Sequence, residues 1–366
     1  MRKTKRGKWN ALKLLLIICV LAAAGIGGYA AYGMRMADKL AGMTFEEMIA
    51  YTVKDKKDAA ITVGIIQGGK TDYKVYGGQG EAVPQAGQMY EIGSITKTFS
   101  ASLLCKAISE GKASLGHTID KYLSLPGGAS YPTLRSLVTH TSGYKSHYLE
   151  LPMVSSFLSG ENSFHGISGE MLTRRIGKVR LSEPDYPFRY SNFGMAVLGL
   201  VLEQIYAADY AELMERYIRE DLGLAHTKIA GPGDGLQNGW QWSRSDAYLS
   251  AGALLSDIGD MMAYLQLQLL GKPAYLLTAH EALAQVNASS ASRRKMGIRV
   301  DSAGIGWMID EKNGIVWHNG ATGSYNSYIG FDKERQIGVV VLSNLPPDYR
   351  IPATVMGVKI LTGLQE

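Results

Sequence analysis

Three stretches of this chain carry a serine followed three residues later by a lysine. They are Ser94–Lys97, Ser142–Lys145 and Ser292–Lys295. The second copy lies in a predicted turn, and the third lies in a polar, basic stretch that we expect to be solvated. The first copy, within YEIGSITKTFS, precedes an apolar helical pattern that would bury its lysine.

The Ser94–Lys97 pair suits nucleophilic catalysis. A serine hydroxyl is a poor nucleophile until a neighbouring base takes its proton. Residues three apart on a helix share a face, with Cβ atoms about 5–6 Å apart. Burial would lower the pKa of Lys97 toward a useful value, and free backbone N–H groups at the helix start can stabilise an oxyanion. A simpler reading also stands at this point, in which Ser94 caps the helix and Lys97 points to solvent.

The elements that must position this pair alternate along the chain. Two apolar runs around a Gly-Gly turn, AAITVGIIQGGKTDYKVYGG, predict two strands, and short apolar runs after Gly304 predict four more. We therefore expect an α+β fold in which both chain ends complete an antiparallel sheet flanked by helices, with an all-helical lobe beside it. Helical periodicity marks 94–108, 191–206, 209–223 and 256–270, with a last helix at 351–364.

The N-terminal part differs from the rest of the chain. Residues 1–13 form a basic tail, and the uncharged segment 14–33 is long enough to span about 30 Å of hydrocarbon. The cations before this segment predict a single-pass anchor with a cytoplasmic tail and an exported body. A cleaved signal peptide ending near Ala22–Ala24 is the alternative, and it would secrete the body. We expect a linker with a first helix, FEEMIAYTV, at 34–58, and the folded domain at 59–366.

Composition argues against two kinds of partner. Without the six cations of the tail, 32 Lys and Arg residues remain against 33 acids, so charge gives no support for nucleic-acid binding. The seven histidines are scattered, and none has a Cys or Glu partner at a zinc-ligand spacing. We therefore expect no metal and no cofactor.

Five motifs together resemble the penicillin-recognising serine hydrolases, the branch with class C β-lactamases, D,D-peptidases and related esterases. The likeness runs from about Ala59 to the C-terminus and implies the β-lactamase/transpeptidase-like fold. The motifs appear in the family's order: EIGSITKTFS, LVTHTSGY at 137–144, YSN at 190–192, AGALLSDIGDM at 251–261 and HNGATG at 318–323.

The resemblance implies a catalytic role for three residues. Ser94 would attack a carbonyl and carry the acyl group, and Lys97 would share or shuttle its proton. Tyr190 would act as phenol or phenolate in proton transfer to and from the leaving group. A phenol with a pKa near 10 needs a nearby cation to become a base, and Lys97 is a candidate for that cation.

The resemblance also implies a set of substrate-binding residues. Asn192 would hydrogen-bond the substrate's amide, and His318 and Gly320 would lie on a strand edge that lines the cleft. The backbone N–H groups of Ser94 and Ala321 would form the oxyanion hole. Each has a plainer reading: Asn192 or its neighbour Ser191 as a helix cap, and His318 as a strand residue without a role.

His318 departs from the family pattern. Many members carry K-T-G at this position, where the lysine is suited to a substrate carboxylate. A histidine, with an ordinary pKa near 6.5, is only partly charged at neutral pH. Efficient β-lactamase activity is therefore less expected than hydrolysis of other substrates, because esterases and D-amino-acid peptidases of this branch carry H-x-G.

These inferences predict an extracytoplasmic serine hydrolase that forms an acyl-enzyme on Ser94. Its candidate substrates are cell-wall peptides ending in D-amino acids, β-lactams and small esters. A binding or sensor protein that keeps the cleft without turnover is the first alternative. A structural, membrane-anchored domain is the second, and it predicts no labelling of Ser94.

Overall fold

The computed structural model describes residues 31, 33–77, 80–82, 87–159, 161–183 and 185–366. The predicted basic tail at 1–13 and nearly all of the predicted anchor or signal peptide at 14–33 lie outside these residues. Both therefore stay predictions. Within the described ranges, no helix combines the length and the apolar character needed to cross a membrane.

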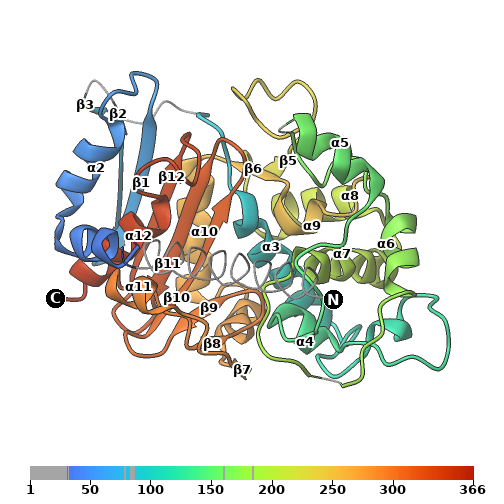
Figure 1. Cartoon of the computed structure of the whole chain (residues 1–366). Coiled ribbons are helices and arrows are strands. Elements are labelled where there is room, and N and C mark those ends of the chain that lie inside the picture. The colour runs from blue at the N-terminus through green and yellow to red at the C-terminus, as the bar shows by residue number, and fades with distance from the viewer. Residues whose placement is uncertain (1–30, 32, 78–79, 83–86, 160, 184) are drawn as a thin grey trace, which may run out of the picture.

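A nine-stranded antiparallel sheet is built from both ends of the chain (Figure 1). Its order is β3-β2-β1-β12-β11-β10-β9-β8-β7, so the first strand lies between the second and the last. β1 pairs with β12 from Ile61↔Ser343 to Ile66↔Gly338. The prediction of an antiparallel sheet completed by both chain ends is confirmed. The strands are β1 Ala60–Gln67, β2 Lys70–Gly77, β3 Gly80–Ala82, β7 Ala284–Gln285, β8 Ser302–Ala303, β9 Met308–Asp310, β10 Ile315–Ala321, β11 Asn326–Asp332 and β12 Ile337–Ser343.

The central strands are buried on both faces. Every residue of β12 is buried, which explains its unbroken apolar run IGVVVLS. Successive side chains point to opposite faces of the sheet. Val340 and Leu342 accordingly join one core cluster, while Val339 and Val341 join the other.

Helices cover the two faces. α12 (Ala353–Gly363) and α2 (Phe45–Val53) pack on one face, and α10 (Ile258–Leu270) packs on the other. α10 approaches closely because β1 and β12 present glycines to it. A Cβ at Gly64 would lie 2.3 Å from Met262 Sδ, and one at Gly338 would lie 2.9 Å from the side chain of Leu265.

Part of the predicted linker at 34–58 is packed into the folded body. The helix expected at FEEMIAYTV is α2, which begins with a capping box between Thr44 and Glu47. Leu40, Met48 and Ile49 are buried in the core cluster on the α12 face of the sheet.

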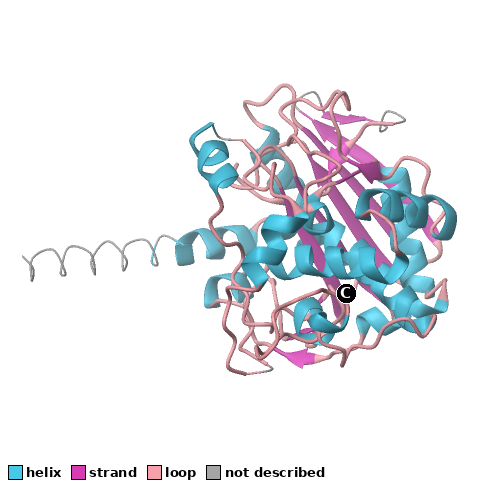
Figure 2. Ribbon diagram, turned by 90° about the vertical axis from the view of Figure 1, so that its right-hand side faces the viewer, coloured by secondary structure: helices cyan, strands magenta, loops and turns pink. Residues whose placement is uncertain are grey.

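A helical lobe stands beside the sheet and lies in front of it in Figure 2. The helices predicted at 94–108, 191–206 and 256–270 are α3, α7 and α10, and Ser191 and Asp257 cap the last two. The pattern at 209–223 gives α8 followed by a π-helical turn, η3 Tyr217–Asp221. The helices and turns whose bounds have not yet been given are η1 Gly93–Ile95, α3 Thr96–Ser109, η2 Ile119–Lys121, α4 Leu134–Val138, α5 Leu151–Ser159, α6 Gly169–Ile176, α7 Asn192–Tyr206, α8 Tyr210–Arg216, α9 Leu249–Gly252, η4 Ala274–His280 and α11 Ala291–Lys295.

A second, three-stranded sheet of very short strands connects the two lobes. Its order is β4-β6-β5, with β4 Tyr90–Glu91, β5 Lys228–Ile229 and β6 Leu254–Ser256. β4 leads directly into η1, which carries Ser94, and then into α3, which carries Lys97. The sequence gives no sign of this sheet, because strands of two or three residues are too short to show a period.

Candidate active site

Ser94 lies in the 3₁₀ turn η1, and Lys97 lies in the first turn of α3. The residue at the cap position of α3 is Ile95, and no side chain caps this helix start. Lys97 is fully buried. The simpler reading, a capping serine with a lysine in solvent, is therefore wrong.

Lys97 is held against the hydroxyl of Ser94. Its Nζ lies 2.8 Å from Ser94 Oγ and donates to the carbonyl oxygen of Ala251 in α9 at 2.6 Å. Burial lowers the pKa of Lys97 well below its ordinary value, because a charged ammonium loses its hydration inside the protein. The amine is thus placed and tuned to accept a proton.

Tyr190 completes a contact group with these two residues. Its side chain hydrogen-bonds that of Ser94, and its ring centroid lies 5.0 Å from Lys97 Nζ. Burial raises the pKa of Tyr190 above the ordinary value of a phenol, an effect that the hydrogen bond with Ser94 only partly offsets. Tyr190 is therefore a phenol, able to donate a proton, across the neutral range.

Two neutral histidines surround Tyr190. The ring of His140 lies 4.5 Å from the Tyr190 ring, and that of His318 lies 6.2 Å from it. Burial and the nearby Lys97 lower the pKa of His318 to about 3 and hold that of His140 well below its ordinary value. Both Nε2 atoms are buried without a hydrogen-bond partner in the described part of the chain.

Two glycines let the nucleophile's turn approach β10. Gly93 has φ 51°, and a Cβ there would lie 2.6 Å from the backbone nitrogen of Ala321. A Cβ at Gly320 would lie 1.9 Å from the carbonyl oxygen of Ile92. This close packing brings the backbones of Ser94 and Ala321 together, as an oxyanion hole from their N–H groups requires.

A cavity of about 350 Å³ opens beside Ser94. β10 pairs with β11 along its whole length but with β9 only through Ile315–Trp317. Beyond that point, no described strand pairs with this edge of β10, and Asn319 and Ala321 line the cavity. The lining residues are Ser94, Phe188, Tyr190, Ala288, Arg293, Val300, Met308, Trp317, Asn319 and Ala321.

Of the predicted binding residues, Ala321 is among the residues that line the cavity, whereas Asn192, His318 and Gly320 are not. Side chains alternate along β10, so Asn319 and Ala321 line the cavity whereas His318 points inward and is buried. His318 and Gly320 lie on the predicted strand, which lines the cavity through Asn319 and Ala321, and their role in substrate binding stays a prediction. Asn192 is the first residue of α7, outside the lining, and its Nδ2 lies 3.5 Å from Ser146 Oγ.

The other two serine–lysine copies do not resemble the first. Lys145 and Lys295 are both exposed, and the exposure of the third copy was expected from its polar surroundings. Lys295 pairs with Asp38, and the Ser292 hydroxyl hydrogen-bonds Ser290. Neither lysine contacts its serine among the described residues, so burial by α3 distinguishes the first copy.

Sequence reasoning missed several residues of the site. Glu91 is buried three residues before Ser94, and its carboxylate accepts hydrogen bonds from the Trp240 backbone and the Thr322 hydroxyl. It therefore ties the turn after β10 to the loop at Trp240. An acid between apolar residues, as in YEIGS, is the one signal that pointed to it. Phe188 and Arg293 belong to no motif.

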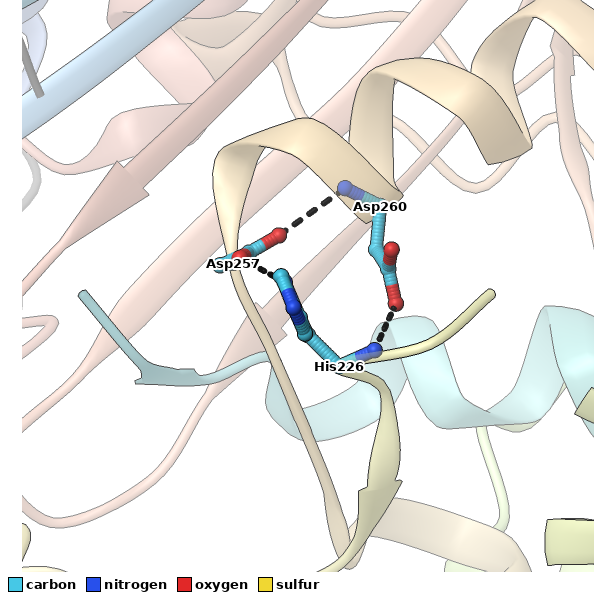
Figure 3. A group of neighbouring side chains, drawn as sticks. All are labelled: His226, Asp257 and Asp260. Carbon is cyan, nitrogen blue, oxygen red and sulfur yellow. Dashed lines mark hydrogen bonds and ion pairs between the residues drawn. The ribbon is translucent and has the colours of Figure 1, made fainter. Parts of the chain in front are cut away.

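A separate group of titratable residues, His226, Asp257 and Asp260, has ligand atoms within 4.8 Å of one another (Figure 3). Three of its four carboxylate oxygens already accept hydrogen bonds. Asp260 Oδ2 accepts from the backbone of His226 and from both the backbone and hydroxyl of Thr227, while Asp257 caps α10 and pairs with His226 Nδ1 at 2.6 Å. The group thus fastens the loop before β5 to the start of α10, and these bonds account for its geometry.

Comparisons with known proteins agree with this architecture. Residues 45–354 match the family model described as Beta-lactamase. "Protein flp" of Staphylococcus aureus (strain NCTC 8325 / PS 47) is 23% identical over 284 residues, covering 71% of this chain and 53% of that protein. A "Beta-lactamase" of Providencia stuartii is 28% identical over 192 residues, 51% of this chain and 47% of that protein. The chain spans about half the length of these curated relatives.

Solved structures share the fold at low identity. The octameric penicillin-binding protein homologue from Pyrococcus abyssi superposes with a TM-score of 0.71 and 23% identity, over 88% of this chain and 76% of that one. A β-lactamase/D-alanine carboxypeptidase from Yersinia pestis gives a TM-score of 0.69 and 18% identity, over 92% and 99% of the two chains. Because the family model covers most of the sequence, this protein belongs to the β-lactamase family.

Proposed function

We propose that the protein is a serine hydrolase that forms an acyl-enzyme on Ser94. The observation that carries this proposal is the buried amine of Lys97, 2.8 Å from Ser94 Oγ and without a carboxylate partner among the described residues. A lysine in a purely structural setting would be paired or would reach solvent.

Acylation follows from the protonation states of the three groups. Ser94 Oγ attacks the substrate carbonyl and its proton passes to the neutral amine of Lys97. The negative charge that develops on the carbonyl oxygen is stabilised by the N–H groups of Ser94 and Ala321. As the tetrahedral intermediate collapses, the leaving group takes a proton from the Tyr190 phenol, and Lys97 returns a proton to Tyr190.

Deacylation runs through the same groups in reverse. A water molecule takes the place of the leaving group and gives its proton to the Lys97–Tyr190 pair as it attacks the acyl carbonyl. Ser94 leaves with a proton, and the site returns to its starting state. The free edge of β10 at Asn319–Ala321 offers the substrate backbone a strand to pair with throughout.

The substrate classes that fit are D-amino-acid peptides, β-lactams and small esters. The β-lactamase and D-alanine carboxypeptidase among the similar proteins support the first two. We place the enzyme at the outer face of the cell membrane through its N-terminal segment, or secreted if that segment is cleaved. This location rests on the basic tail followed by twenty uncharged residues, and it would bring the site near peptidoglycan.

Active-site labelling tests the proposal. The purified protein is treated with a fluorophosphonate and, separately, with a fluorescent penicillin, and the intact mass is measured. We expect one adduct on wild type, none on Ser94→Ala, and an unchanged adduct on Ser292→Ala, which removes the serine of an exposed copy. Absence of any adduct on wild type would refute the acyl-enzyme. An adduct without release of hydrolysed product would indicate a binding or sensor protein instead.

A further inference from the structure

A second cavity, which we call the basic cavity, is lined by the end of α6, the loop after it and parts of the segments 143–148 and 186–189. Its volume is about 340 Å³. Of its ten described lining residues, five are cationic and none is acidic, although the chain outside its basic tail has nearly equal numbers of cations and acids. The five are Lys145, Arg175, Lys178, Arg180 and Arg189.

Three of these cations have no hydrogen-bond acceptor or acid as a partner among the described residues. Lys145, Lys178 and Arg189 are all exposed. The Nζ of Lys145 lies 5.8 Å from the centroid of the Tyr148 ring, which also lines the cavity. Like charges around one cavity repel one another, and a bound anion would remove that repulsion.

The other two cations are held in place by the protein and keep free donors. Arg175 donates through Nε to Glu150 Oε1 at 2.7 Å and through Nη2 to the carbonyl oxygen of Leu149 at 3.0 Å. Arg180 donates through Nη1 to the carbonyl oxygen of Gly177 at 2.8 Å. Because a guanidinium has five N–H donors, both side chains are fixed and can still bind a ligand.

Backbone hydrogen bonds fix one wall of the basic cavity. The N–H of Tyr186 donates to the carbonyl oxygen of Thr141, and that of Arg189 donates to the carbonyl oxygen of His140, both at 2.8 Å. The segment that carries Arg189 is therefore fastened to the turn that precedes Lys145. A wall that is already ordered lowers the entropy lost when a ligand binds.

The basic cavity is separate from the cavity beside Ser94. The two share no lining residue. Phe188 and Tyr190 line the cavity beside Ser94, whereas Arg189 between them lines the basic cavity. A ligand can therefore occupy the basic cavity while Ser94 stays accessible.

We propose that the basic cavity binds a ligand with two or more phosphate groups. A single negative charge would leave most of the five cations without a counter-charge. The oxygens of a phosphate diverge in three dimensions, so they can accept hydrogen bonds from cations on several sides of a cavity. Soluble oligophosphates and neighbouring headgroups of anionic phospholipids share this chemistry. The proposal does not depend on the hydrolase function.

Isothermal titration calorimetry of the full chain tests the proposal. The ligands are inorganic orthophosphate, pyrophosphate and tripolyphosphate, at low ionic strength and without divalent metal ions. We expect one site per chain, with affinity rising in that order. The triple variant Lys145→Gln/Lys178→Gln/Arg189→Gln should bind tripolyphosphate about thirtyfold more weakly, or about threefold for each exposed cation.

A matched triple variant controls for net charge. Lys54→Gln/Lys57→Gln/Lys312→Gln removes the same charge from exposed lysines outside the lining, and it should bind tripolyphosphate as wild type does. Arg293→Gln, in the cavity beside Ser94, should also bind normally. The proposal is overturned if wild type binds no tripolyphosphate, if both triple variants lose affinity equally, or if Arg293→Gln is the variant that loses it.

Amide hydrogen exchange distinguishes the two sources of phosphate. It is measured over residues 175–181 with the full chain in vesicles of phosphatidylglycerol and of phosphatidylcholine. Slower exchange in phosphatidylglycerol, absent from the triple variant at Lys145, Lys178 and Arg189, would assign the cavity to lipid headgroups. Equal exchange in both lipids, with tripolyphosphate binding intact, would assign it to a soluble phosphate compound.

Discussion

Two groups of titratable side chains in this protein differ in burial and in hydrogen bonding. The outer group is His226, Asp257 and Asp260, and the inner group is Lys97, Tyr190, His140 and His318. In the outer group, His226 is exposed, whereas Asp257 and Asp260 are largely buried. Their carboxylates accept hydrogen bonds from backbone N–H groups, from the Thr227 hydroxyl and from His226. The inner group lies in the active site and includes two buried imidazole nitrogens without a partner in the described structure. In the outer group, the basic side chain of His226 is paired with the carboxylate of Asp257. The inner group contains no carboxylate.

The difference separates a structural cluster from a reactive one. The hydrogen bonds of the outer group hold a loop in place and use most of its carboxylate oxygens. Buried groups with unused capacity are costly, and they persist where function requires them. Closeness of titratable residues is thus a weaker sign of chemistry than the state of their hydrogen bonds.

Removing the amine of the inner group should have the largest effect. We expect Lys97→Met to lower kcat/KM for an activated ester about a thousandfold or more, because Ser94 loses the base that accepts its proton. Stopped-flow measurement of p-nitrophenol release would show it. Lys295→Met, in an exposed copy of the motif, should retain full activity. If the Lys97→Met enzyme were acylated at nearly the wild-type rate, Lys97 would not be the base, and the inner group would not be the reactive one.

Removing only the phenol oxygen should have a smaller effect. Tyr190→Phe keeps the ring that packs against His140 and removes the proton donor to the leaving group. We expect about a hundredfold loss in kcat/KM for amide substrates and a milder loss for p-nitrophenyl esters, whose leaving group needs little proton transfer. Equal losses for both substrate types would assign Tyr190 a positioning role.

The pH dependence should show which group is the base. Because Lys97 must be unprotonated, kcat/KM should rise about tenfold per pH unit up to its pKa and then stay level, since the raised pKa of Tyr190 keeps the phenol protonated. The midpoint of the rise should lie well below 10.5, the ordinary value for lysine. A midpoint at the ordinary lysine value would contradict the effect of burial.

The outer group should give the smallest effect, and on stability alone. The hydrogen bond that His226 donates to Asp257 raises the pKa of His226. The pair therefore stabilises the fold fully below pH 6.5 and loses this effect as pH rises through the raised value. His226→Gln should lower the free energy of unfolding by less than about 1 kcal/mol at acidic pH and by less again at alkaline pH, because the side chain is exposed. Urea melts at both pH values measure this. A change in hydrolysis rate would make the outer group functional.

Periodic patterns predicted most of the framework from the sequence. Long apolar repeats mark the strands at both chain ends and the helices α3, α7, α10 and α12. The apolar side chains of these elements are buried in the core, as the repeats predict. The π-helical turn after α8 escaped prediction because its side chains fit an α-helical period equally well. The sheet of two- and three-residue strands that holds Glu91 has no period to detect.

The site was predictable where one local motif contains it, and less so where distant segments meet. Ser94 and Lys97 share one helical turn, so their contact follows from spacing. Which face of β10 turns inward depends on the register with β11, so the burial of His318 and the exposure of Asn319 could not be read from HNGATG. Arg293 reaches the cavity through the packing of α11, which no linear pattern records.

The antiparallel pairing of β1 with β12 has a consequence for how the protein is made. During synthesis from the N-terminus, β1 emerges early and cannot form this pairing until β12 has been synthesised. β10, which carries half of the oxyanion hole, also comes late. Contacts between such distant segments make folding slow. Ser94 and Lys97 are therefore synthesised long before the strands that complete the cleft around them.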